Sequence, residues 1–193
     1  MRFEDLTVQQ YISLSKLPKD MEPLDKIANE MAIVTGKALE EVELMDVNYI
    51  MSKIAFLKQV PTDLDFKRKL RIGFKYYSPS VELTNISVNQ MVDFYSLYKN
   101  EAQLNELLAV IYKPSNGAYH SDKHSYVANK MLSKKIGDVL GAVFFSLRFY
   151  TQCEKLIQEY LVKNQELLAQ TMDEIQNDKE FQDFLSSGGG NIT

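Results

Sequence analysis

The chain contains one helix-start pattern twice, in LTVQQYISL at residues 6–14 and in ISVNQMVDF at residues 86–94. In both copies a hydroxyl residue stands three positions before a glutamine, between apolar neighbours. This is the capping-box spacing, in which the hydroxyl accepts the backbone N–H three residues on and the glutamine reaches back to the cap N–H. The four predicted capping residues are Thr7, Gln10, Ser87 and Gln90. The pattern therefore predicts two capped entries into helices.

The likeness between the two copies continues beyond the helix start. At the same offset of 80 positions, apolar residues align at the 3- and 4-residue spacing of an amphipathic helix face. The aligned pairs are Leu24 with Leu104, Ile27 with Leu107 and Met31 with Ile111. We interpret this as duplication of a helical unit. Two similar three-helix units that arose by simple patterning are the alternative.

Apolar periodicity and proline positions give the remaining elements. We predict helices at 7–16, 22–34, 46–58, 87–99, 101–112, 124–135, 136–163 and 165–185, and strands at 67–75 and 79–84 connected through YYSP. The fold class is mainly α, with two related helical units joined by a small antiparallel β-hairpin and followed by a C-terminal amphipathic helix. The predicted divisions are 1–62, 63–85, 86–163 and 164–193. The run VLGAVFF is apolar on almost every side, which predicts a central, fully buried helix.

Charge is distributed unevenly along the chain. The formal net charge is −4, yet residues 164–193 carry six acidic residues and one lysine, so the preceding residues are nearly neutral. A nearly neutral body with an acidic end is not expected to bind nucleic acid. VLGAVFF is far shorter than the roughly 20 apolar residues of a membrane span, and no signal-peptide pattern opens the chain. We expect a soluble, intracellular protein without a membrane partner.

The two histidines of the chain, His120 and His124, lie in YHSDKHSY beside Asp122. Histidines four apart on a helix can share a metal ion, and a carboxylate can add a third ligand. The alternative, which we favour, is a polar surface loop in which Ser121 or Asp122 caps the next helix. The chain contains none of the glycine-rich phosphate-binding or nucleophile-elbow motifs. We therefore expect no enzymatic activity, no bound metal and no cofactor.

The most basic segment precedes and includes the first predicted strand. Its candidate contact residues are Lys67, Arg68 and Arg71. A solvated strand face is the simpler interpretation, and contact with a phosphate or an acidic partner is the alternative.

The segment from Leu24 to Leu57 resembles the small tail assembly chaperones of tailed bacteriophages. Those proteins show an aliphatic helix that ends in a T-G turn, an acidic step and then an Asp-containing helix that ends in F-L. The matching elements are Thr35-Gly36, Glu40-Glu41-Val42, Asp46 and Phe56-Leu57. The resemblance covers about 34 residues, less than a fifth of the chain. LTNISVNQMVDFYSL also resembles that family's entry into its first helix.

The resemblance implies a non-enzymatic role in phage morphogenesis. Such chaperones coat the aggregation-prone tape-measure protein and help recruit tail-tube subunits, so partners of tape-measure or tail-tube type and self-association are expected. The expected location is the host cytoplasm during assembly. A structural component that stays in the virion, such as a head–tail or internal protein, is the alternative, and a host-directed binding module is a third interpretation.

The C-terminal helix is the predicted partner-binding element. An acidic helix with bulky apolar residues can dock in a groove of a partner, whereas packing of this helix on its own body is the alternative. The predicted contact residues are Ile175, Phe181, Phe184 and Leu185.

Overall fold

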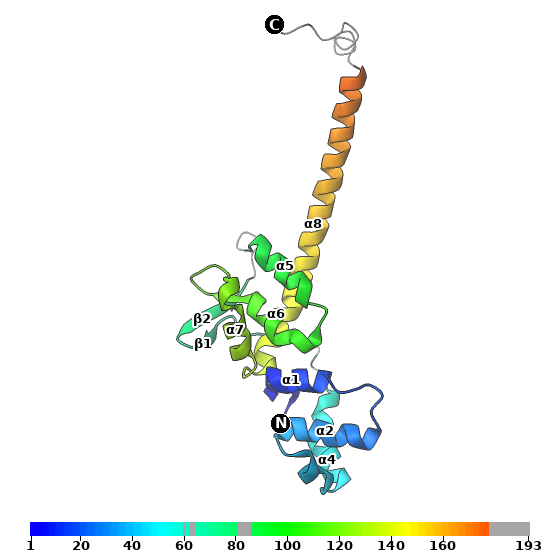
Figure 1. Ribbon diagram of the computed structural model, residues 1–193, viewed down its shortest axis with the longest axis vertical. Coiled ribbons are helices and arrows are strands. Elements are labelled where there is room, and N and C mark those ends of the chain that lie inside the picture. The colour runs from blue at the N-terminus through cyan, green and yellow to red at the C-terminus, as the bar shows by residue number, and fades with distance from the viewer. Residues whose placement is uncertain (60, 62–64, 81–85, 178–193) are drawn as a thin grey trace. The chain divides into compact units, whose positions relative to one another are not determined.

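A computed structural model describes residues 1–59, 61, 65–80 and 86–177 (Figure 1). The chain divides into two compact units, Met1–Phe149 and Tyr150–Thr193. Its fold is mainly helical with a small three-stranded antiparallel sheet, which confirms the predicted fold class. The elements are η1 Phe3–Asp5, α1 Val8–Ser15, α2 Pro23–Thr35, α3 Leu39–Glu43, α4 Val47–Ile54, η2 Ala55–Lys58, β1 Leu70–Ile72, β2 Lys75–Pro79, α5 Val88–Leu97, η4 Glu101–Gln103, α6 Leu104–Ile111, β3 Tyr112–Pro114, η5 Ser121–Lys123, α7 His124–Met131 and α8 Ile136–Asn177.

The two repeated helix starts open α1 and α5, but they are capped differently. At α1, Thr7 Oγ1 accepts from the Gln10 backbone N–H at 3.1 Å, and Gln10 Oε1 accepts from the Thr7 N–H at 2.8 Å. At α5, Ser87 Oγ accepts from the Gln90 N–H at 3.2 Å. The Gln90 side chain does not return to Ser87, since its Oε1 has no hydrogen-bond partner among the described residues. Only the first copy therefore closes the full box.

Both glutamines use their Nε2 atoms to hold the end of a following helix. Gln10 Nε2 donates to the carbonyl oxygens of Ile33 at 3.3 Å and Val34 at 2.9 Å, in the last turn of α2. Gln90 Nε2 donates to the carbonyl oxygen of Val110 at 2.7 Å, in the last turn of α6. Such terminal carbonyls lack intrahelical donors. The repeated motif therefore fastens one helix start to another helix end in each copy.

The β-hairpin turns earlier than the sequence predicts. β1 and β2 are joined by the two-residue loop Gly73-Phe74, and Ile72 pairs with Lys75. Gly73 has φ 60°, which suits the first central position of a tight hairpin turn. The predicted connection through YYSP is wrong because those residues belong to β2, and the predicted strand at 67–75 contains the turn. Residues 81–84 of the second predicted strand lie outside the described residues.

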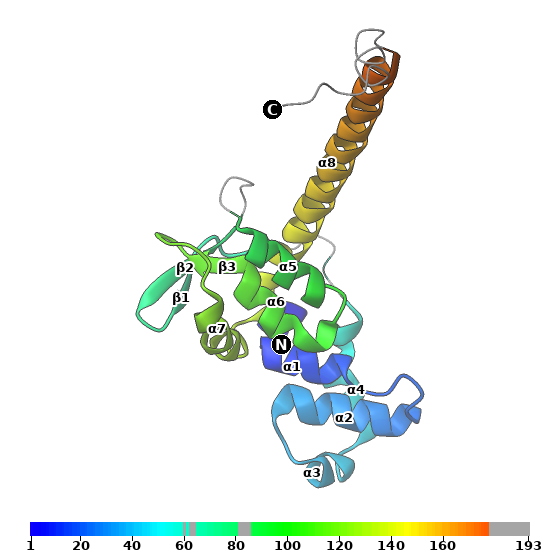
Figure 2. The same ribbon diagram turned by 45° about the horizontal axis from the view of Figure 1, so that its top comes forward.

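A third strand, β3, was not predicted. The predicted helix at 101–112 begins as η4 and ends at Ile111, and Tyr112–Pro114 then pairs antiparallel with Tyr77–Pro79 of β2. Figure 2 shows β2 and β3 side by side next to α6. Pro79 ends β2 and Pro114 ends β3, each opposite a tyrosine of the other strand, and these prolines made the strand pattern hard to see because proline lacks a ladder donor.

α8 is one helix where the sequence predicted two, at 136–163 and 165–185. Residues 142–177 contain no glycine or proline, so no backbone feature interrupts the helical hydrogen bonds. The predicted full burial of VLGAVFF is also wrong. Val139 and Val143 are buried, whereas Phe144 is 50% exposed.

The helices α2, α3 and α4 lie together within the first unit (Figure 2), and they enclose a small core of their own. Its buried members are Met31, Val42, Ile50 and Ile54. Because this core is small, its three helices cannot bury all of their apolar side chains. The surface left over forms the candidate site.

Candidate functional site

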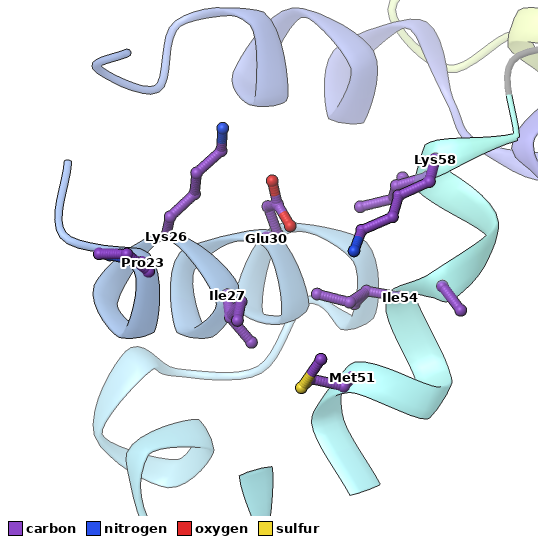
Figure 3. Close-up of a pocket in the computed structure, with 9 residues that line it drawn as sticks. Pro23, Lys26, Ile27, Glu30, Met51, Ile54 and Lys58 are labelled. Atoms are coloured by element: carbon purple, nitrogen blue, oxygen red, sulfur yellow. The ribbon is translucent and has the colours of Figure 1, made fainter. Parts of the chain in front are cut away.

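A groove of about 450 Å³ lies between α2 and the α4–η2 segment (Figure 3). We call it the α2–α4 groove. Its lining residues are Pro23, Lys26, Ile27, Glu30, Met51, Ile54, Ala55, Leu57 and Lys58. This volume falls within the range of roughly 300–1,000 Å³ that is typical of binding sites.

Local sequence explains why these side chains converge. Pro23 is the first residue of α2, where its fixed φ and missing N–H are tolerated. Ile27 and Glu30 follow at positions i+4 and i+7, so all three share one face of the helix. On the other wall, Asp46 Oδ1 accepts from the Tyr49 N–H at 2.9 Å and caps α4. This cap sets the helical phase that places Met51 in the groove.

The groove has an apolar floor and a charged rim. Ile54 is buried and Ile27 and Leu57 are half-buried, while Met51 remains 45% exposed. In Figure 3 the polar ends of Lys26 and Glu30 lie to one side of Ile27 and Met51, and Lys58 reaches toward Ile54 from η2. An apolar floor gains free energy when a partner's side chains displace water from it.

The helices α2 and α4, and the turn that follows α3, expose further apolar side chains. The additional side chains are Leu24 at 65%, Leu44 at 89%, Val47 at 43% and Tyr49 at 49%. Exposed apolar side chains of this size are available for contact with a partner. The chemistry available here is apolar contact combined with ion pairing at the rim.

The predicted histidine pair does not converge on a shared position. His124 Nε2 lies 2.7 Å from Glu106 Oε2, and its Nδ1 lies 3.2 Å from the hydroxyl of Tyr119. That hydroxyl donates to Asp93 Oδ2 at 2.7 Å. Both ring nitrogens of His124 are therefore engaged without His120, which is exposed. Among the described residues, no group of three or more potential ligands could hold a metal ion.

The predicted cap of the following helix is wrong. Neither Ser121 nor Asp122 caps α7; both lie in η5, the 3-10 turn that leads into the helix. The N-cap position of α7 is Lys123, which makes no side-chain capping bond. A 3-10 turn can replace a side-chain cap because its own backbone bonds satisfy part of the helix terminus.

The predicted basic residues Lys67, Arg68 and Arg71 lie just before and within β1, and their contact with a phosphate or an acidic partner remains a prediction. Lys67 Nζ lies 2.9 Å from Asp138 Oδ2, and its backbone N–H donates to the Asp138 carbonyl at 2.8 Å. Arg71 Nε donates to the Gly73 carbonyl at 3.3 Å, within the hairpin. Arg68 is exposed. The contacts of Lys67 and Arg71 hold the hairpin segment in place.

The predicted C-terminal contacts cannot be compared with the structure. Phe181, Phe184 and Leu185 lie outside the described residues, as does the side chain of Ile175. They remain predictions.

Comparison of the chain with protein-family models, with curated proteins and with solved structures gave no match. Within the ranges that the structure describes, no helix combines the length and the apolar composition needed to cross a lipid bilayer.

The groove residues themselves were missed in the sequence. The available signal was the number of apolar residues in VNYIMSKIAFL. Ile50 and Ile54 fill the buried face of the helix, so Val47, Tyr49 and Met51 are apolar residues in addition to that face. That surplus shows that some apolar side chains stay exposed. Only the crossing of α2 over α4 shows that a groove results.

Proposed function

We propose that the chain is a non-enzymatic phage morphogenesis protein, a tail assembly chaperone that shields an apolar segment of a tape-measure-type tail protein. The supporting observation is the α2–α4 groove, with its apolar floor and its charged rim. The groove falls within Leu24–Leu57, the segment that resembles the chaperone family, except for Pro23 and Lys58 at its ends.

The partner that fits such a groove is an amphipathic helix. Helices dock in grooves by inserting apolar side chains spaced three and four residues apart. Met51 and Ile27 would receive these side chains, while Lys26 and Lys58 would pair with acidic residues at the edge of the partner. Occupation of the groove would keep the partner's apolar face from aggregating until assembly in the host cytoplasm.

A co-expression experiment tests the groove. Met51→Asp places a charge in the apolar floor, and Val92→Asp on α5 is the matched control because Val92 is 61% exposed and lies outside the lining. We expect the tape-measure-type protein to stay soluble and co-purify with wild type and with Val92→Asp. With Met51→Asp, recovery should fall about tenfold or more, because an unpaired charge is costly in an apolar contact. Equal recovery with both variants would contradict the groove assignment.

Particle composition separates the chaperone role from a structural role. Mass spectrometry of purified particles should not detect a chaperone. Detection of the chain at stoichiometric amounts would favour the alternative, a structural component of the virion.

A further inference from the structure

The second unit presents an apolar stripe along α8. We define the α8 stripe as Leu156, Ile157, Tyr160, Leu161, Asn164, Leu167, Leu168 and Met172. Its seven apolar side chains are exposed by 47–67%. This surface differs from the α2–α4 groove, which belongs to the first unit.

The spacing of the stripe is that of a helix–helix seam. Positions 157, 161, 164 and 168 are separated by four, three and four residues, which is the alternation of a heptad repeat. At about 100° per residue the stripe occupies one side of α8, and Lys155, Glu159 and Glu166 project from the other. The helix therefore has one apolar face and one charged face.

Asn164 lies at the centre of this apolar face. It is eight positions from Leu156 and eight from Met172, the two ends of the stripe. A single asparagine in a seam fixes register by pairing with the same asparagine of another copy, at some cost in stability. Against a purely apolar partner its amide would be buried without hydrogen bonds. The central position allows Asn164 to meet its copy whether the two helices run parallel or antiparallel.

We infer that two copies of this chain associate through their α8 stripes, with Asn164 of one copy against Asn164 of the other. The seven apolar side chains each expose about half of their surface, so complete burial of the stripe would remove at most on the order of 700 Å² per copy from water. This approaches the roughly 800 Å² per partner of stable protein interfaces. A membrane surface is a poorer occupant, because the charged face mixes lysines with glutamates and lacks the basic excess of membrane-binding helices.

Two neighbouring residues provide a matched test in the full chain. Leu161 and Val162 are both 54% exposed, but Leu161 belongs to the stripe and Val162 lies on the opposite side. Size-exclusion chromatography with light scattering should give a dimer mass for wild type and for Val162→Asp, against a chain mass of 22.2 kDa. Leu161→Asp should raise the dimer dissociation constant about a hundredfold or more. Circular dichroism of both variants should show that they keep the helix content of the wild-type chain, so that a change in mass reflects association and not unfolding.

Asn164→Leu tests the register. The substitution should tighten the assembly or change its copy number, because it removes the polar residue from the seam. A monomeric wild type at all concentrations, equal masses for Leu161→Asp and Val162→Asp, or an Asn164→Leu variant identical to wild type would each overturn the inference. Tape-measure binding should persist in Leu161→Asp, and dimerisation should persist in Met51→Asp, so failure of one proposal is distinguishable from failure of the other.

Discussion

Gln90→Leu should destabilise the first unit because it removes the donor that caps the end of α6. Gln90 is fully buried, and its Nε2 donates to Val110 O at 2.7 Å and to Ser80 Oγ at 2.9 Å. The usual helical donor for the Val110 carbonyl would be the N–H of residue 114, but that residue is Pro114. The neighbouring Ile111 carbonyl already accepts from the Ser80 N–H at 2.9 Å.

The magnitude follows from which polar groups lose a partner. A buried carbonyl left without a donor costs about 1–3 kcal/mol, and the bond to the Ser80 hydroxyl contributes about 0.5–1.5 kcal/mol. The substitution also removes Gln90 Oε1, which has no partner among the described residues, and this offsets about 1 kcal/mol. The net loss of unfolding free energy is about 2 kcal/mol, which lowers the folded-to-unfolded ratio roughly 30-fold.

Urea denaturation followed by far-ultraviolet circular dichroism measures this loss. With a slope of about 2 kcal/mol per molar urea, the midpoint should fall by about 1 M at an unchanged slope. Ser80→Ala is the control, since it keeps the Gln90–Val110 bond and should cost less than Gln90→Leu. Gln10→Leu should cost about 1 kcal/mol, because Gln10 is only half-buried and water can replace part of its bonding.

Either of two results would refute this reasoning. If Gln90→Leu were as stable as wild type, or less affected than Ser80→Ala, the side chain would not be the effective cap of α6. The repeated pattern would then stabilise only the starts of α1 and α5, and not the end of α6.

Three further predictions concern the packing and charge of the first unit. Gly137→Ala should lower stability by roughly 2 kcal/mol in thermal melts, since a Cβ there would lie 2.5 Å from Glu4 Cβ; an unchanged melting temperature would contradict this packing. The hydrogen bond from Lys135 lowers the pKa of Asp5 below 3.8, so the contribution of Asp5 to folding stability is present above pH 3.8 and is lost as pH falls through the lowered value. Asp5→Asn should therefore be less stable than wild type at pH 7 and equally stable in strong acid. A stability difference that stays constant with pH would count against the bond. Burial raises the pKa of Tyr112, so this tyrosine ionises at a lower pH in the unfolded chain than in the folded one, and folding stability should decline above pH 10. Tyr112→Phe should make that decline less steep. Parallel curves of stability against pH for the two proteins would show that Tyr112 is not its source.

Helix starts could be predicted because their signals are local. The helices that begin at residues 8, 23, 47, 88, 124 and 136 lie within one residue of the predicted starts. A cap, a proline or a change of periodicity operates over three or four neighbouring residues. The mainly helical class follows from the same signals.

The errors lie where a residue's role depends on distant parts of the chain. β3 forms because Tyr112–Pro114 meets β2, and nothing within those three residues requires a strand. Phe144 and Phe145 are exposed although Val143 before them and Ser146 after them are buried, since only packing decides which side of an apolar helix is covered. His124 turns to Glu106 rather than to His120, because α6 brings that carboxylate within 2.7 Å.

In the repeated helix-start pattern, too, some interactions are local and others depend on distant residues. The sequence by itself determined that Thr7 and Ser87 begin helices, because a hydroxyl reaches an N–H three residues away without tertiary help. Only the tertiary structure decided that the glutamines fasten α2 and α6, since their acceptors lie 20 or more residues away. The α2–α4 groove was likewise decided by packing, because its two walls belong to separate helices whose crossing leaves apolar side chains uncovered.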